Sequence, residues 1–130
     1  MYSQTTRHIQ VTVMPVFLAE QSDPSESHYV WAYTIQLENL GPESAQLINR
    51  HWHITDSQGG VQEVQGVGVI GEQPRLEPGD TYQYSSGVAL KTPSGIMVGT
   101  YEMETDTGER FLIDIPTFSL DSPDQVGRPN

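Results

Sequence analysis

The segment that decides the fold covers residues 61–87 and reads VQEVQGVGVIGEQPRLEPGDTYQYSSG. Gly66, Gly68 and Gly71 give it the GxGxxG pattern of a dinucleotide-binding loop. Such a loop works when a helix begins within it, because the first N–H groups of that helix bind the pyrophosphate. Residues 61–64 can supply the preceding strand, but two prolines soon after the glycines prevent a sustained helix. The pattern therefore does not predict a Rossmann fold.

Apolar residues alternate with polar ones along most of the chain, which is the period of a half-buried β-strand. The clearest run extends from Tyr29 to Leu37, and Pro15 is expected to mark a bend or a sheet edge. Other runs cover residues 9–13, 46–55, 82–90, 96–104 and 110–115. Turn residues separate the runs, and no parallel βαβ unit is visible. The pattern predicts an all-β fold: an antiparallel β-sandwich of the fibronectin type III or immunoglobulin-like kind, with about seven to eight strands.

A chain of 130 residues without cysteine fits one domain with a single core and no disulfide framework. We expect the domain to span residues 3–127, with flexible segments at residues 1–6 and 121–130. The first residues are polar and lack the apolar segment of a signal peptide, and no apolar run approaches the roughly 18 residues of a membrane span. These features predict a cytoplasmic protein that does not insert into a membrane.

The charge balance narrows the class of partner. Six basic residues face 17 acidic ones, which gives a net charge of −11. Nucleic-acid binding depends largely on phosphate neutralisation by lysine and arginine, so DNA and RNA are not expected partners. The same field repels a free polyphosphate unless a divalent cation or a local arginine offsets it.

The heptapeptide that begins at Leu76, Leu-Glu-Pro-Gly-Asp-Thr-Tyr, matches the tyrosine corner of β-sandwiches. In that corner the phenol donates a hydrogen bond to the backbone a few residues upstream. Leu76, Pro78, Gly79 and Tyr82 are therefore expected to be structural residues.

Five segments, taken in order, resemble the ApaG family: residues 50–56 (RHWHITD), 64–74 (VQGVGVIGEQP), 76–79 (LEPG), 84–87 (YSSG) and 95–103 (GIMVGTYEM). The resemblance implies a fibronectin type III-like β-sandwich in a stand-alone bacterial protein. Relatives of the domain are fused to eukaryotic F-box and polymerase-δ-interacting proteins, which implies protein binding. The bacterial family is associated with cobalt tolerance and magnesium efflux, and its gene neighbourhood includes a diadenosine tetraphosphate hydrolase. The family brings no established catalytic residues.

The glycine loop is a candidate site for an anion or a protein partner. Consecutive N–H groups around Gly66, Gly68 and Gly71 can form an anion-binding nest without a helix, and Arg75 is near enough in sequence to face a phosphate. The alternative is a bulge or tight bend between strands, where any side chain would clash.

His51 and His53 are the candidate metal ligands. Two residues apart in a strand, they share one face, and imidazole suits zinc, cobalt or nickel. A third ligand is not apparent from the spacing, and Asp56, Glu63 or an acid on a neighbouring strand is the candidate for it. The alternative is that both histidines are ordinary exposed residues of a polar strand face.

Arg50 has the same strand parity as Trp52 and Ile54, so strict alternation directs it toward the core. A buried guanidinium needs a carboxylate or several carbonyl groups as partners. Arg50 is thus expected to have a structural role, anchoring Asp56 or the glycine loop, unless a bulge turns it outward. Trp52 is expected to be a core residue.

No arrangement of catalytic residues stands out. There is no thiol nucleophile and no Gly-x-Ser-x-Gly elbow, and the acids Glu102, Glu104, Asp106 and Glu109 would hold magnesium loosely or form a solvated sheet edge. We therefore expect a non-enzymatic module without a cofactor that binds a protein partner and is linked to divalent-cation homeostasis. The alternative is a small-ligand module for a nucleotide-like polyphosphate or a divalent metal ion. Open sheet edges would also allow a homodimer.

Overall fold

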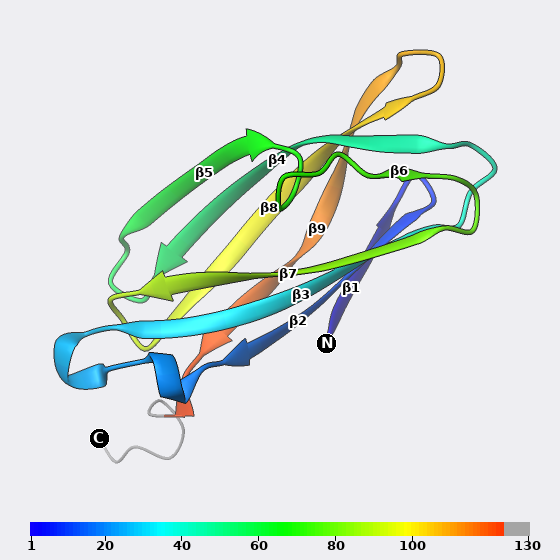
Figure 1. The fold of residues 1–130 in the computed structure, drawn as a ribbon. Helices are drawn as coiled ribbons and strands as arrows, with labels where there is room; N and C mark the ends of the chain where they lie inside the picture. The colour runs from blue at the N-terminus through cyan, green and yellow to red at the C-terminus, as the bar shows by residue number, and fades with distance from the viewer. Residues whose placement is uncertain (124–130) are drawn as a thin grey trace.

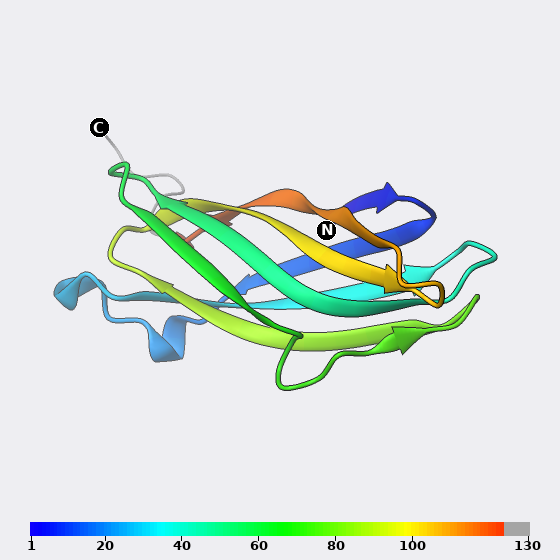
Figure 2. The same cartoon turned by 90° about the horizontal axis from the view of Figure 1, so that it is seen from above.

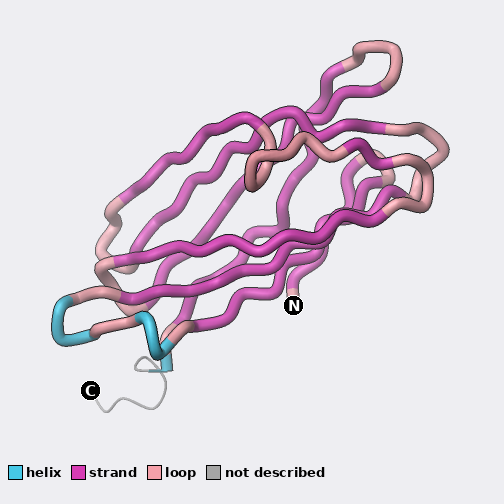
Figure 3. The backbone as a smooth tube through the Cα atoms, in the orientation of Figure 1, coloured by secondary structure: helices cyan, strands magenta, loops and turns pink. Residues whose placement is uncertain are grey.

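A computed structural model describes residues 1–123, which form nine strands and two single-turn 3-10 helices, η1 (Ala19–Gln21) and η2 (Pro24–Glu26) (Figures 1 and 3). The strands are β1 (Tyr2–Thr6), β2 (Ile9–Phe17), β3 (Tyr29–Asn39), β4 (Ala45–Asp56), β5 (Val61–Val67), β6 (Arg75–Leu76), β7 (Thr81–Leu90), β8 (Ser94–Thr105) and β9 (Arg110–Asp121). None of the helical segments in this part of the chain has the length and apolar character needed to cross a membrane.

The strands form two antiparallel sheets that lie face to face (Figure 2). One sheet has the order β1-β2-β3-β7, and the other has the order β5-β4-β8-β9. The two-residue strand β6 pairs with the start of β4, so β5 and β6 follow each other along the same edge of that strand. The predicted antiparallel β-sandwich is confirmed. The count exceeds the expected seven to eight strands because β1 and β6 carry little apolar pattern of their own.

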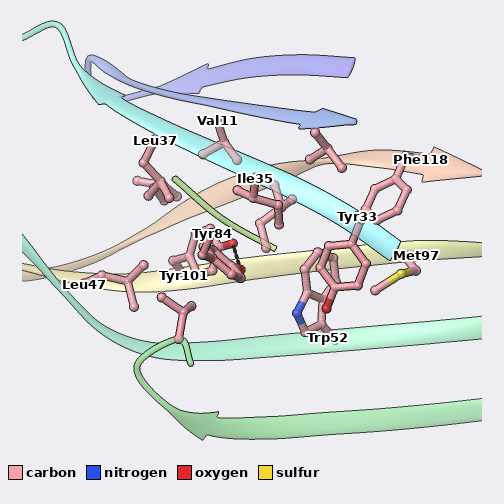
Figure 4. Close-up of a cluster of buried hydrophobic side chains, with 14 of the residues drawn as sticks. Val11, Tyr33, Ile35, Leu37, Leu47, Trp52, Tyr84, Met97, Tyr101 and Phe118 are labelled. Carbon is pink, nitrogen blue, oxygen red and sulfur yellow. Dashed lines mark hydrogen bonds between the residues drawn. The ribbon is translucent and has the colours of Figure 1, made fainter. Parts of the chain in front are cut away.

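The alternation in β3 explains why this strand lies at the centre of its sheet. Every second side chain from Tyr29 to Leu37 is buried, and the strand pairs with β2 on one side and β7 on the other. The opposite sheet contributes Leu47, Trp52 and Met97 to the same core (Figure 4). The aromatic rings meet edge to face or tilted, a geometry that adds to the burial of apolar area.

The chain ends differ from the expectation of flexible segments. Residues Tyr2–Thr6 form β1, which pairs with β2 over all five residues. Pro15 lies in β2 past Val13, the last residue that β1 pairs, as expected of a proline at a sheet edge. At the other end, Asp121 closes β9 and Ser122 is buried, while residues 124–130 of the expected tail lie outside the described residues.

The two lateral sides of the sandwich are built differently. On the side that we call the closed side, β1 and β2 pack against β9. The Tyr2 and Phe118 rings lie 6.0 Å apart there, and the Arg7 guanidinium lies 4.2 Å from the centre of the Phe111 ring. On the opposite side, the open side, the edge strands β5 and β7 flank a pocket that reaches the core.

Candidate functional site

Gly66 lies in β5 directly opposite Arg50 of β4. A β-carbon at this position would stand 2.7–2.8 Å from three atoms of the Arg50 guanidinium. Any other residue would therefore displace the arginine. The first glycine of the GxGxxG pattern makes room for a side chain of its own protein.

The other two glycines shape a tight turn. At Gly68 the backbone has a φ of +64°, and a β-carbon would lie 2.1 Å from the carbonyl oxygen of Glu72. Val69 and Glu72 exchange backbone hydrogen bonds of 2.8 and 2.9 Å across the two-residue turn Ile70–Gly71, in which both residues have positive φ. Positive φ at both central positions is the hallmark of a type I′ turn, which favours glycine. The geometry is that of a tight bend between strands.

Few donors of this loop are open to an anion. The amides of Gly68, Val69 and Glu72 donate to the carbonyl groups of Ile48, Glu72 and Val69, respectively. The guanidinium of Arg75 contacts Asp106 at 2.8 Å and Glu77 at 3.3 Å. The structure therefore places Arg75 against carboxylates and does not assemble it with the glycines into one phosphate site.

Arg50 points to the inner side of the sheet, as its parity with Trp52 predicts. A bulge between Leu47 and Asn49 accommodates one extra residue upstream of it. Arg50 Nη1 donates to the carbonyl oxygens of Gly68 (2.8 Å) and Val67 (3.3 Å), so it anchors the glycine loop. Asp56, the other partner considered, instead accepts hydrogen bonds from backbone amides in its own turn.

Three phenols, Tyr33, Tyr84 and Tyr101, are buried in the core close enough to Arg50 to feel its charge. The hydroxyl groups of Tyr84 and Tyr101 form a hydrogen bond of 2.5 Å, and Tyr33 lies beside Trp52 (Figure 4). Burial raises the pKa of Tyr33, Tyr84 and Tyr101, and the positive charge of Arg50 offsets part of each increase. The phenols are therefore neutral at physiological pH, and they face the guanidinium as hydroxyl groups without negative charge.

Arg50 and Tyr33, but not Tyr84 or Tyr101, line a pocket of about 310 Å³ on the open side. Its polar lining includes Arg50, Ser86 and the hydroxyl end of Tyr33, and its apolar lining includes Trp52, Val64, Val88 and Met97. The sequence did not single out Tyr33 or Ser86 as site residues, because only the fold brings β3 and β7 against the Arg50 side chain. The one signal in the sequence was that Arg50 alternates in step with the core residues Trp52 and Ile54.

The predicted tyrosine corner is wrong in one respect. The hydroxyl of Tyr82 donates to the carboxylate of Glu72, ten residues upstream, at 2.9 Å, and not to a backbone carbonyl. Burial and this carboxylate raise the pKa of Tyr82. Leu76 is buried, and Pro78 and Gly79 lie in the turn that precedes β7, with a φ of +88° at Gly79. The Pro-Gly turn is present, but the hydrogen bond that defines the corner is not.

His51 and His53 lie on the outer side of β4, as their alternation with Trp52 predicts. The Nε2 atom of His51 is 3.6 Å from a carboxylate oxygen of Glu63, and Glu63 is the residue of β5 that lies opposite His53. Within residues 1–123, no group of three or more histidine, aspartate or glutamate side chains has the arrangement of a metal site.

The acidic cluster of β8 and β9 is matched by arginines. Arg110 contacts Glu104 at 2.7 Å and Glu102 at 3.2 Å. Asp106 pairs with Arg75, as described above, and Glu109 pairs with Arg7 at 2.9 Å. The acids that were considered as loose magnesium ligands are therefore engaged in ion pairs on the protein surface.

The outer face of the β5-β4-β8-β9 sheet is defined by the side chains that point away from the core. It carries five of the nine exposed large hydrophobic residues in the described part of the chain: Val61, Val67, Ile96, Val98 and Leu112. The polar residues His51, His53 and Thr100 lie among them. A shallow depression of about 550 Å³ crosses this face between Val67 and Leu112.

Known proteins are similar to this chain in sequence and in fold. A family model described as the ApaG domain matches residues 19–105. Protein ApaG of Paramagnetospirillum magneticum is 60% identical over 130 residues, 100% of both chains, and that of Rhodospirillum centenum is 58% identical over the same length. The crystal structure of an ApaA protein from Bordetella pertussis matches with a TM-score of 0.86 and 49% identity, covering 88% of this chain and 94% of that one. The resemblance in the sequence is thereby confirmed, and the chain belongs to the ApaG family.

Proposed function

We propose that this protein is a non-enzymatic interaction module that binds another protein through the outer face of the β5-β4-β8-β9 sheet. The observation that carries the proposal is the gathering of exposed aliphatic side chains on this one face. Exposed apolar side chains gathered on one face of a protein are typical of a protein-binding site. The depression between Val67 and Leu112 offers a place for a partner side chain.

The partner class comes from the family. Its association with cobalt tolerance and magnesium efflux makes a protein of divalent-cation transport or sensing the first candidate. In this proposal the module acts on cation balance through that partner. A polyphosphate in the glycine loop has less support, because loop amides and Arg75 are already engaged within the protein. A metal ion at His51 and His53 would need ligands from outside the described residues.

Affinity capture with matched variants tests the proposed face. Val67→Glu combined with Leu112→Glu places two charges beside the depression, whereas Val16→Glu places one on an exposed residue of β2 in the other sheet. We expect the wild-type and Val16→Glu proteins to retain the same partner and the double variant to lose it. Equal recovery by all three baits would contradict the proposal.

Two further readouts separate the alternatives. Light scattering after size-exclusion chromatography shows whether the face joins two copies of this chain, since a dimer would dissociate in the double variant. Growth on cobalt of cells that carry each variant tests the cation link. If cells with the double variant tolerate cobalt normally although the variant has lost its partner, the proposed role in cation balance is contradicted.

A further inference from the structure

We propose that the pocket on the open side is a binding site for a small organic carboxylate with an apolar body, held by Arg50. This inference goes beyond the protein-binding face, because the pocket opens between β5 and β7 and lies on the inner side of the sheet. The carboxylate would meet the guanidinium, and the apolar body would pack among Trp52, Val64 and Met97.

Arg50 lacks an anionic partner within residues 1–123. Each of the other arginines in residues 1–123 contacts a carboxylate: Arg7 with Glu109, Arg75 with Asp106, and Arg110 with Glu104. Arg50 makes no such contact within the described part of the chain, and the hydrogen bonds it donates there, both from Nη1, go to neutral carbonyl groups. A guanidinium carries five N–H donors, and a partly buried charge is costly without a counter-ion.

The side chains that line the pocket fit a carboxylate with an apolar body. One guanidinium matches the two oxygens of one carboxylate in a bidentate geometry. Tyr33 and Ser86 line the same pocket and bring hydroxyl groups, which are hydrogen-bond donors, to its wall. Aromatic and aliphatic side chains form the rest of the wall, as in sites for small ligands with an apolar body.

The charge of the pocket fits a monocarboxylate better than a polyphosphate. A polyphosphate needs several cations, whereas Arg50 is the cation that the pocket offers. The net charge of −11 opposes a highly charged ligand more than a singly charged one. The pocket volume, about 310 Å³, also falls at the lower end of small-molecule sites.

Titration with benzoate, followed by two-dimensional NMR, tests the site in the full-length protein. We expect saturable shifts at the Nε–Hε group of Arg50, the indole of Trp52 and the amides of Ser86 and Gly87. Benzamide has the same shape without the charge and is expected to bind at least about tenfold more weakly. N-acetylphenylalanine and a tripeptide that ends in phenylalanine distinguish a free acid from the carboxyl terminus of a peptide.

Two variants that each remove one positive charge test whether benzoate binds at Arg50. Arg50→Met is expected to weaken benzoate binding about tenfold or more, whereas Arg75→Met is expected to change it less than about twofold. If Arg50→Met does not fold, Arg50→Lys keeps the charge but loses the bidentate geometry and is expected to bind more weakly than wild type. The proposal is overturned if benzoate causes no saturable shift in these residues of the wild-type protein. It is also overturned if benzamide binds the wild-type protein as tightly as benzoate does. The same holds if the Arg50→Met protein binds benzoate as tightly as wild type does.

Discussion

On the closed side of the sandwich, β1 and β2 pack against β9 through the Tyr2 and Phe118 rings, and the hydroxyl of Tyr2 lies 3.1 Å from that of Ser119. On the open side, the strands β5 and β7 flank a pocket, and the Arg50 side chain occupies the space above Gly66. The closed side is therefore built from apolar contacts between the sheets, whereas on the open side a charged side chain binds the loop that follows β5 in its own sheet.

The difference shows that the two sides of one core contribute unequally to stability. Apolar contact between sheets stabilises the fold, because burial of aromatic side chains is a dominant favourable term. A partly buried guanidinium contributes less, because its desolvation offsets its interactions. Arg50 anchors the glycine loop through Nη1, and its other N–H groups are the donors that the proposed carboxylate would use.

The largest expected effect tests the closed side. Phe118→Ala removes a ring that contacts Tyr2, Tyr33 and Trp52, and a buried phenylalanine truncated to alanine costs about 3–5 kcal/mol. Urea denaturation should show this loss in the free energy of unfolding. Leu112→Ala, an exposed residue of the same strand, is the control and should stay within about 0.5 kcal/mol of wild type. Similar losses for both variants would remove the contrast between core and surface.

The next effect tests the loop that borders the open side. Gly68→Ala combines a positive φ with a contact of 2.1 Å to the Glu72 carbonyl, so we expect a loss of about 2–4 kcal/mol in the free energy of unfolding. Gly71 has a positive φ but no atom within 4 Å of the added carbon, so Gly71→Ala should cost only about 1–2 kcal/mol. Thermal and chemical denaturation measure both. Equal costs would mean that the loop can open without loss of contacts.

A third prediction isolates the pair of Gly66 and Arg50. Gly66→Ala places a β-carbon against the guanidinium, which can shift because it ends a flexible side chain, so the cost should be about 0.5–1.5 kcal/mol. Gly87→Ala meets only an ordinary contact of 3.5 Å. In the background of Arg50→Ala, the cost of Gly66→Ala should fall, because the clash is gone. A double-mutant cycle of unfolding free energies measures the coupling. Additive costs would show that the glycine serves another purpose.

The smallest effect concerns the ion pair at the rim of the closed side. The hydrogen bond from Arg7, reinforced by its charge, holds the pKa of Glu109 below its ordinary value of 4.5. A lowered pKa in the folded state gives stability that is present above the ordinary value and is lost as the pH falls through the folded-state pKa. Both side chains are exposed, so the gain is small and salt reduces it.

Unfolding curves of wild type and Glu109→Gln across acidic pH measure this contribution. The two proteins should differ slightly at neutral pH and converge below the pKa of the paired glutamate. A gap that persists in acid would mean that the substitution acts through packing and not through charge.

The sequence could predict the sandwich because the alternation in β3 and β4 reports directly which side chains are buried. The same parity correctly directed Arg50 and Trp52 inward and both histidines outward. β1 escaped prediction because its residues, Tyr-Ser-Gln-Thr-Thr, carry no apolar alternation. Its strand geometry is imposed by pairing with β2, which a local pattern does not contain.

The candidate site could be predicted only in part, because it depends on contacts between segments that are distant in the sequence. The partner of Tyr82 is Glu72 because a turn returns the loop toward β7, and the motif alone pointed to a backbone carbonyl. The pairing of Arg7 with Glu109 spans 102 positions, so the acids looked free in the sequence. The pocket needs β3, β4, β5, β7 and β8 together, and no spacing of residues encodes that arrangement.

The contact between Tyr2 and Ser119 has a consequence for the synthesis of the protein. The two residues are 117 positions apart, so at about 5–20 residues per second the ribosome needs roughly 6–23 s between them. The hairpin of β1 and β2 emerges first, and its apolar face, which includes Ile9, Val11 and Val13, waits for β9 during that interval. The growing chain, more than the finished sandwich, is therefore the form that needs protection from aggregation.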